Sequence, residues 1–160
     1  MEWNGPFIIS IHREVFGSLF PHLAGHTRTN DSLFGSRAGP PWEHVNSLIE
    51  QLVLQIQDHL TQVRSTLDPA EQLDRIFTFA ARDHAEMLRI HPFIDGNGRW
   101  ARITTVLFLI DCGLRVGTIL RKRDKAVYIA AADRCIDFGE PGDLANLFIQ
   151  GYVDVLKFQR

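Results

Sequence analysis

Apolar residues recur at spacings of three and four along most of the chain, a periodicity that predicts amphipathic helices. A first apolar stripe covers residues 8–19, and Pro21 is expected to end that helix because proline lacks a backbone donor. A second stripe covers residues 45–63. A third begins at "LDPAEQ", where Asp68 is expected to cap the helix and Glu71 to complete a capping box. The chain is therefore expected to be built mainly from helices.

The pattern changes in the second half of the chain. Residues 99–112, "RWARITTVLFLIDC", are apolar almost all round after the first turn, which predicts a central helix buried on most sides and stopped by Gly113. Two shorter amphipathic segments follow at about 124–135 and 143–158. Between the first two helices, "HTRTNDSLFGSRAGPP" is rich in glycine, proline and small polar residues, and is either an exposed loop or a short hairpin. The pattern predicts a single all-α domain over residues 1–160.

Composition and charge narrow the class of protein. The 160 residues are 45% hydrophobic and 22% charged, with a net charge of −2, which suits one globular domain and argues against a nucleic-acid partner. The densest basic cluster, "RKRDK" at 121–125, is interpreted as a solvated connection. Cys112 and Cys135 lie in apolar helical patterns and are expected to be reduced packing residues. Without a signal-like start or an apolar run of about 20 residues, the sequence favours a cytoplasmic protein with no membrane partner.

One short segment, "RIHPFIDGNGRWAR" at 89–102, concentrates unusual chemistry. Gly96 and Gly98 remove side chains where the backbone turns, so a ligand can approach closely. The free N–H groups at the start of the next helix, together with its dipole, form an anion site. Arg99 and Arg102 are three residues apart on one face of that first turn, where guanidinium groups clamp phosphate oxygens. The combination predicts a polyphosphate site.

An acid and a histidine beside this anion site add reactive groups. The Asp95 carboxylate would repel phosphate unless a cation lay between them, and Mg²⁺ is the natural bridge. His91 has a side chain whose pKa suits it to taking a proton from an incoming hydroxyl near neutral pH. Phe93 is interpreted as an apolar peg that fixes the loop to the core. These residue types together predict phosphoryl or nucleotidyl transfer.

Several of these residues also have simpler interpretations. Asp95 alone could be a helix cap beside turn-forming glycines, and His91 alone could be a structural histidine. A calcium loop counted from Asp95 fails, because Trp100 and Val106 stand where glycine and glutamate are required. A zinc site built on His84 and His91 lacks further ligands nearby, and His84 is expected to lie in the core. No P-loop sequence is present.

The whole segment resembles the signature of Fic-domain proteins, H-P-F-x-[DE]-G-N-G-R-x-x-R. Every specified position matches: His91, Pro92, Phe93, Asp95, Gly96, Asn97, Gly98, Arg99 and Arg102. The resemblance extends to "IHREVFGSLFPHLAGHTRT" and "YIAAADRCIDFGEPGDLANLFIQGYVDVL", and is weakest between 30 and 70. It implies the Fic fold: a compact helical bundle, a motif loop at 91–98, a central helix at about 99–112, and a β-hairpin flap at about 28–40.

The resemblance also implies an activity and a set of roles. Fic enzymes typically move AMP from ATP, their co-substrate, to a Ser, Thr or Tyr hydroxyl of a target protein. By position, His91 is implied as the general base and Asp95 as the Mg²⁺ ligand. Contacts to the nucleotide are implied for Gly96, Asn97, Gly98, Arg99, Arg102 and Tyr128. A core role for Tyr128 is an equally good alternative. The flap residues 29–37 are implied to dock the target backbone by strand addition.

Alternatives of function stay open at this point. Some relatives transfer another phosphate-containing group, such as UMP or a phosphoryl group. The intact run Gly96–Gly98 favours AMP transfer over the phosphorylating branch, in which this pattern is altered. A protein that keeps the fold as a catalytically silent nucleotide-binding or interaction module is the alternative from another class. A nucleotidyltransferase is the preferred interpretation.

Regulation is also implied by the family. Many Fic proteins carry an inhibitory [ST]-x-x-x-E-[GN] helix whose glutamate pairs with the second motif arginine. Here Glu14 alone has a serine or threonine four residues before it, Ser10, and Val15 then stands at the Gly/Asn position. This segment falls in the predicted first helix and is interpreted as a decoy. The hypothesis is therefore that Arg102 lacks a partner glutamate in this chain, and that a separate antitoxin-like protein restrains the enzyme, as in bacterial toxin–antitoxin pairs.

Overall fold

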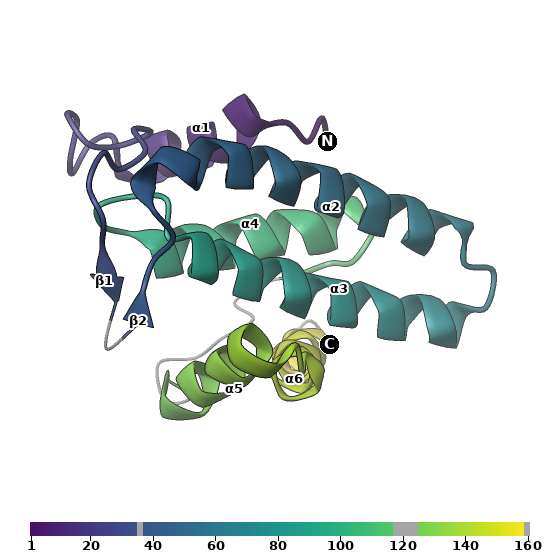
Figure 1. Cartoon of the computed structure of the whole chain (residues 1–160). Coiled ribbons are helices and arrows are strands. Elements are labelled where there is room, and N and C mark those ends of the chain that lie inside the picture. Colours follow the sequence, from purple (N-terminus) through teal and green to yellow (C-terminus); the bar gives the residue numbers. More distant parts are fainter. Residues whose placement is uncertain (35–36, 117–124, 159–160) are drawn as a thin grey trace.

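The computed structural model of the chain describes residues 1–34, 37–116 and 125–158, and this part is mostly helical, as predicted (Figure 1). The elements are α1 (Gly5–Phe16), β1 (Leu33–Phe34), β2 (Arg37–Ala38), the short 3-10 helix η1 (Trp42–His44), α2 (Val45–Ser65), α3 (Pro69–Ile90), α4 (Asn97–Asp111), α5 (Lys125–Phe138) and α6 (Gly142–Phe158). Most of the basic cluster at 121–125 lies outside the described residues.

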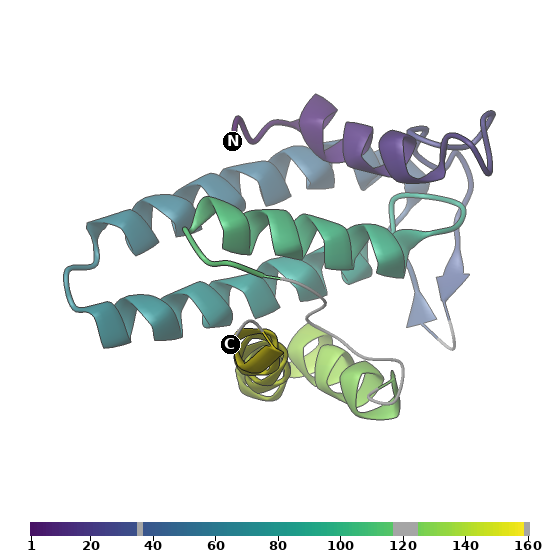
Figure 2. The same ribbon diagram turned by 180° about the vertical axis from the view of Figure 1, so that it is seen from behind.

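Helix α3 is the axis of the bundle, since it packs against α2, α4, α5 and α6. Helices α2 and α3 lie side by side, and the view from behind shows α4 between α1 and α3 (Figures 1 and 2). The side chains of Trp100, Ala101, Thr104 and Leu109 are fully buried, whereas Ile110 is 45% exposed. Helix α4 is therefore the central buried helix predicted from its apolar sequence.

Helix α1 is shorter than its apolar stripe predicted. It ends at Phe16, well before Pro21, and the last stripe residue, Leu19, is 62% exposed. Consecutive turns replace the helix, beginning where the Leu19 N–H donates to the Phe16 carbonyl (2.9 Å). The prediction that Pro21 ends the helix was therefore wrong. The chain leaves the helix before Pro21 and turns back toward the motif loop, where the Arg28 N–H donates to the Pro92 carbonyl (2.8 Å).

The long hairpin of α2 and α3 matches its sequence pattern more closely. The Asp68 carboxylate accepts from the Glu71 N–H at 2.8 Å and so caps α3, as predicted. The Glu71 carboxylate is bound by Arg75 (2.7 Å). The apolar stripe of α2 is buried along its whole length, which joins α2 to the core through the face expected from its periodicity.

Glycines set both ends of α4. The helix begins at Asn97, earlier than the expected start near 99, because Gly96 adopts a left-handed conformation (φ +81°) and makes the turn into the helix. At the other end, Gly113 has φ +86° and its N–H donates to the Ile110 carbonyl (2.9 Å). This is the glycine stop predicted from the sequence.

The flap is a two-stranded antiparallel hairpin. The composition of this segment left open whether it is a loop or a hairpin, and the hairpin implied by the family resemblance is confirmed. In its register Leu33 faces Ala38 and Phe34 faces Arg37. Both strands lie within the expected segment 28–40. Strands of two residues carry few ladder hydrogen bonds, so contacts with the rest of the molecule must hold this hairpin in place.

The remaining expectations concern thiols and membranes. Cys112 and Cys135 are both free, and burial raises the pKa of the Cys112 thiol to about 12. Burial also raises the pKa of Cys135. Cys135 is buried, whereas Cys112 is only partly so. Within the described ranges, every helix is too short or too polar to cross a bilayer.

Candidate active site

The backbone of His91 is unusual. It is the C-cap of α3 and the one non-glycine residue with positive φ (φ 48°, ψ 59°) in the part of the chain described. Its N–H still donates to the Met87 carbonyl (3.2 Å), so the helix is satisfied up to this residue. A left-handed conformation is uncommon for a residue with a side chain and costs energy. The chain turns sharply here and places the His91 imidazole on the wall of the motif cavity.

The His91 ring is held by two neighbours. Its Nδ1 lies 3.4 Å from the Leu88 carbonyl, so we assign the ring proton to Nδ1, which leaves Nε2 with a free lone pair. The Phe34 ring of the flap stacks on it, with centroids 4.3 Å apart and planes 5° from parallel. Burial lowers the pKa of His91, the charge of Arg28 acts in the same direction, and the Leu88 carbonyl opposes them. The imidazole is therefore held neutral, the form that a general base requires.

Asn97 holds the motif loop together from inside. Its Oδ1 accepts from the Phe93 N–H (2.9 Å) and its Nδ2 donates to the Phe93 carbonyl (2.7 Å). Both residues are buried, at 2% and 1% exposure. Both polar atoms of the Asn97 side chain are thus used within the loop. The Asn97 backbone N–H, at the start of α4, is the group that can bind an anion. The prediction that Phe93 is an apolar peg is confirmed.

Sequence reasoning placed His12 in an apolar stripe and missed its part in the site. The Gly25 N–H donates to its Nδ1 (3.0 Å), so Nε2 carries the ring proton and donates to the Asp95 carbonyl (3.0 Å). The ring stacks on Phe93 at 3.7 Å and contacts Phe16. Burial lowers the pKa of His12, which keeps the ring neutral in this role. A buried imidazole from α1 therefore holds the motif loop through the Asp95 carbonyl and the Phe93 ring.

The two motif glycines have different surroundings. A Cβ on Gly96, at φ +81°, would lie 2.9 Å from the Phe16 ring and 3.1 Å from His12 Nε2. A Cβ on Gly98, inside the first turn of α4, would have Arg102 Nη1 at 3.6 Å as its nearest neighbour, an ordinary contact. Gly96 is therefore required by the fold of the loop. Gly98 is not required by the fold of the loop, and its lack of a side chain leaves space for a ligand to come close.

Alanine at the two positions is expected to separate these roles. Gly96→Ala should lower the free energy of unfolding by about 1–3 kcal/mol, because it strains the backbone and clashes with Phe16. Gly98→Ala should change it by less than about 1 kcal/mol, since alanine suits a helix better than glycine. Urea denaturation of the two variants measures the difference. Equal losses of stability would contradict this assignment.

A cavity of about 270 Å³ opens at the N-terminus of α4. It is lined by His91, Ile94, Asp95, Gly96, Asn97, Gly98, Arg99 and Arg102. The structure thus brings together all the site residues predicted from the motif. Its size is near the lower end of small-molecule pockets, which suits a chain of phosphates and leaves a nucleoside to extend beyond it.

Charged side chains of both signs, Arg99 and Asp95, line the open side of this cavity, where both are exposed. The Arg99 guanidinium lies over the Phe16 ring, 4.5 Å from its centroid, and Nη2 is 3.7 Å from Asp95 Oδ2. Asp95 Oδ1 accepts from the Gly96 N–H (2.6 Å), and the side chain is 66% exposed. No group of three metal-ligating side chains occurs in the described part of the chain. One open carboxylate fits a Mg²⁺ ion that takes its other ligands from phosphate and water, and does not fit an all-protein cage.

Behind Arg102 lies a buried chain of hydrogen bonds. Thr105 Oγ1 donates to the Ala101 carbonyl and so accepts from His84 Nδ1 (2.8 Å), which leaves His84 Nε2 to accept from the Tyr128 hydroxyl (2.7 Å). The Arg102 guanidinium is close enough for its charge to lower the pKa of both His84 and Tyr128. Burial lowers the pKa of His84 to about 3, and the charge of Arg102 adds to this effect. His84 is therefore a neutral core histidine, as predicted.

This chain of bonds defines the surroundings of Tyr128. Its hydroxyl donates to His84 Nε2, and Tyr128 does not line the cavity. Burial raises the pKa of Tyr128, while the nearby Arg102 charge lowers it. The structure thus places Tyr128 one layer away from the motif residues, within reach of the Arg102 charge. Its predicted contact with the nucleotide base stays a prediction.

Arg28 is a second residue that sequence reasoning missed. It is only 3% exposed, and its Nε donates to the His91 carbonyl (2.9 Å), while Nη1 and Nη2 donate to carbonyls of Asn30 (2.9 Å) and Pro40 (2.5 Å). Its backbone N–H donates to Pro92 (2.8 Å). A buried cation thus ties both arms of the flap to the C-terminus of α3, where the helix dipole favours it.

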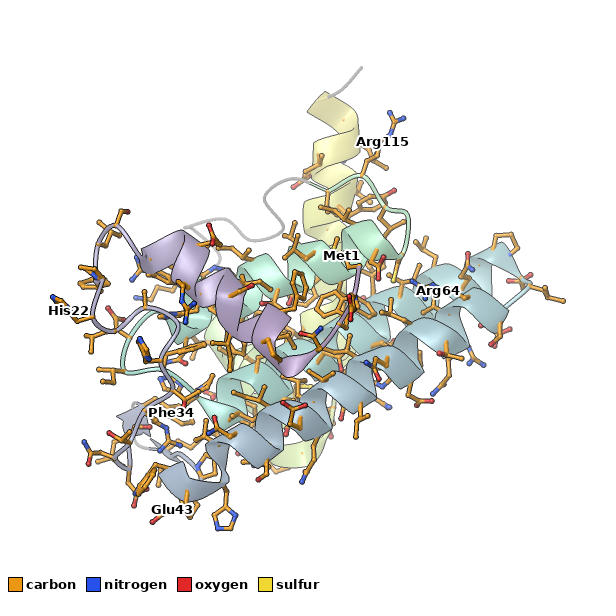
Figure 3. All side chains as sticks on the ribbon, turned by 90° about the horizontal axis from the view of Figure 1, so that it is seen from above. Met1, His22, Phe34, Glu43, Arg64 and Arg115 are labelled. Atoms are coloured by element: carbon orange, nitrogen blue, oxygen red, sulfur yellow. The ribbon has the colours of Figure 1, made fainter. Side chains whose placement is uncertain are left out.

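Figure 3 shows Phe34 of this hairpin at the same end of the molecule as Glu43 and His22.

The chain is similar to known proteins in both sequence and fold. The chain matches the Fic/DOC family over residues 4–109. It is 32% identical over 124 residues to the protein adenylyltransferase fic-1 of Caenorhabditis elegans, covering 78% of this chain and 22% of that protein. A protein adenylyltransferase Fic of Nematostella vectensis is 33% identical over 122 residues, covering 76% and 26%. The chain thus spans about a quarter of the length of the curated relatives it matches.

Solved structures share the fold. Fic-1 (residues 134–508) of Caenorhabditis elegans superposes with a TM-score of 0.76 at 22% identity, covering 99% of this chain and 46% of that one. The BepC effector protein of Bartonella tribocorum, whose structure contains bound AMPPNP, gives 0.71 at 19% identity, covering 93% and 74%. Because the family match takes in the motif loop and well over half of the chain, this protein belongs to the Fic/DOC family.

Proposed function

We propose that this chain is a Fic-type protein adenylyltransferase, which transfers AMP from ATP to a Ser, Thr or Tyr hydroxyl of a target protein. One observation carries the proposal: a single cavity at the N-terminus of α4 is lined by an imidazole, a carboxylate, glycine backbone and two guanidinium groups. The names of the relatives, protein adenylyltransferases, support the same activity.

The reaction assigns one task to each group. His91 Nε2 takes the proton of the target hydroxyl, whose oxygen then attacks the α-phosphorus of ATP. The bond from that phosphorus to the bridging oxygen of the β-phosphate breaks, and pyrophosphate leaves. The N–H groups at the start of α4, with Arg99 and Arg102, stabilise the negative charge on the phosphates. A neutral His91 is ready to act near pH 7, because its pKa is lowered by burial.

Asp95 would hold the magnesium ion. Its Oδ2 lies at the cavity, 3.7 Å from Arg99, while Oδ1 already accepts from Gly96. A magnesium ion held there would supply positive charge that offsets the negative charge of the phosphates. A bound AMPPNP in the structure of BepC, which shares this fold, supports ATP as the co-substrate.

A labelled-nucleotide assay tests the proposal. The protein is incubated with a cell extract and with ATP labelled at the α- or the γ-phosphate, or with α-labelled UTP. Protein labelling from α-labelled ATP alone is expected. Labelling from γ-labelled ATP would indicate phosphorylation, labelling from UTP would indicate UMP transfer, and binding without transfer would indicate a silent module. Each of these three results would overturn AMP transfer.

Three expectations from the sequence stay predictions. They are the single Fic domain over residues 1–160, the docking of a target strand on the flap, and restraint by a separate antitoxin-like protein. Glu14, the decoy for an inhibitory helix, lies exposed on α1. The same assay bears on the restraint: strong inhibition of the purified chain alone, with no other protein added, would contradict a separate inhibitor.

A further inference from the structure

The flap makes a contact with α5 that the motif does not explain. Arg37 Nη1 and Nη2 bind the two carboxylate oxygens of Asp137, the second at 2.8 Å, and Nη2 also lies 3.2 Å from Asp133 Oδ1. The two acids are four residues apart on α5 and so present one face to the arginine. The bidentate hydrogen bond from Arg37 lowers the pKa of Asp137. We call these three residues the flap latch.

The latch and the catalytic histidine meet through one residue pair of the hairpin. Arg37 stands directly opposite Phe34 in the strand register. Side chains of directly opposed residues lie on the same face of a hairpin, so fixing Arg37 also fixes the position of Phe34. Phe34 is the residue whose ring stacks on His91 at 4.3 Å. A continuous path of contacts thus runs from α5 through the flap to the imidazole.

This path matters because little else orients the imidazole. Its Nδ1 is 3.4 Å from the Leu88 carbonyl, which is a long and weak hydrogen bond. Arg28 anchors the base of the flap by donating to the His91 backbone carbonyl, and this hydrogen bond does not fix the orientation of the ring. The parallel Phe34 face is the contact that restricts the plane of the ring. A two-residue hairpin needs a second anchor beyond its base to hold that face in place.

We propose that Arg37 is a positioning residue: by latching the flap to Asp133 and Asp137 of α5, it keeps Phe34 stacked on His91 and so aims Nε2 at the incoming hydroxyl. The geometry of the latch stands on the contacts alone. Its consequence for catalysis rests on the proposed adenylyl transfer.

A spectroscopic experiment tests the latch without using activity. A ring stacked face-on shifts the carbon-bound protons of the His91 imidazole upfield, and Phe34→Leu defines their position without the stack. Arg37→Gln and Asp137→Asn are expected to move these resonances toward the Phe34→Leu position, with Arg37→Lys in between. Arg75→Gln, which removes an exposed arginine–carboxylate pair on α3, is the matched control. Resonances of Arg37→Gln that stay at the wild-type position would overturn the latch.

Kinetics test the catalytic consequence. Arg37→Gln is expected to lower kcat roughly 10-fold or more, since small displacements of a reacting group are costly. The KM for ATP should stay unchanged, because none of the flap residues that the structure describes lines the motif cavity. Unchanged kcat despite displaced resonances would overturn the positioning role. Failure of the wild-type protein to transfer AMP would count against the proposed function, whereas the His91 resonances would still decide the latch.

Discussion

Replacing His91 with alanine is expected to reduce AMP transfer by about 10²- to 10⁴-fold, the usual contribution of a general base. The physical reason is that, among the described residues that line the cavity, His91 has the neutral ring nitrogen suited to taking the hydroxyl proton, since burial lowers the pKa of the ring. ATP binding should persist, because the arginines and the helix N-terminus stay in place. Transfer from α-labelled ATP and equilibrium binding of ATP measure the two effects separately.

The backbone of His91 calls for a second variant. Alanine is strained at φ 48°, whereas asparagine tolerates the left-handed region, so His91→Asn should lose activity while keeping more of the stability. His22→Ala, in the exposed segment after α1, is the matched control and should retain full transfer. Activity near the wild-type level in both His91 variants would exclude the imidazole as the base.

Acid is expected to destabilise the protein in part through His84. The ring is fully buried and neutral, with a pKa of about 3 in the folded protein against 6.5 when exposed. Its contribution to stability is complete above pH 6.5. As the pH falls from 6.5 toward 3, the unfolded chain takes up a proton that the folded protein refuses, so the free energy of unfolding decreases. The loss over this window is roughly 5 kcal/mol, at about 1.4 kcal/mol per pH unit.

Comparison with a variant isolates this contribution from other groups. In His84→Gln the free energy of unfolding should be lower at pH 7, because the bonds to Tyr128 and Thr105 are disturbed. Its decrease between pH 6.5 and 4 should be shallower than in the wild type. His22→Gln, at an exposed position, should keep the wild-type slope. Urea denaturation at a series of pH values gives these slopes, and equal slopes in wild type and His84→Gln would disprove the assignment.

The sequence pattern was most reliable where a structure depends on neighbouring residues. The periodicity of α2, the Asp68 cap and the Gly113 stop are local devices, and each was found where the pattern predicted it. The end of α1 was placed wrongly. There the apolar spacing continues to Leu19, although the chain has already left the helix at Phe16. An apolar spacing records which residues could share a face, and it does not record whether the helix continues.

The residues that support the site could not be predicted from local sequence patterns. Arg28, Phe34 and Arg37 lie in a segment whose composition indicated only a loop or a hairpin, and His12 was one member of an apolar stripe. Each acts through a partner far away in the sequence, such as the His91 carbonyl for Arg28. No local spacing encodes such a pair, because the packing of the helices decides which segments meet.

The sequence by itself therefore determined the helical class, the chemistry of the motif and the membership of the Fic/DOC family, since these depend on residue types at short spacings. The tertiary structure alone decided how that chemistry is held. It set the left-handed turn at His91, the commitment of Asn97 to the loop, the place of Tyr128 behind Arg102, and the path from α5 through the flap to the imidazole. These features arise from contacts across the bundle, which exist only once the helices have packed.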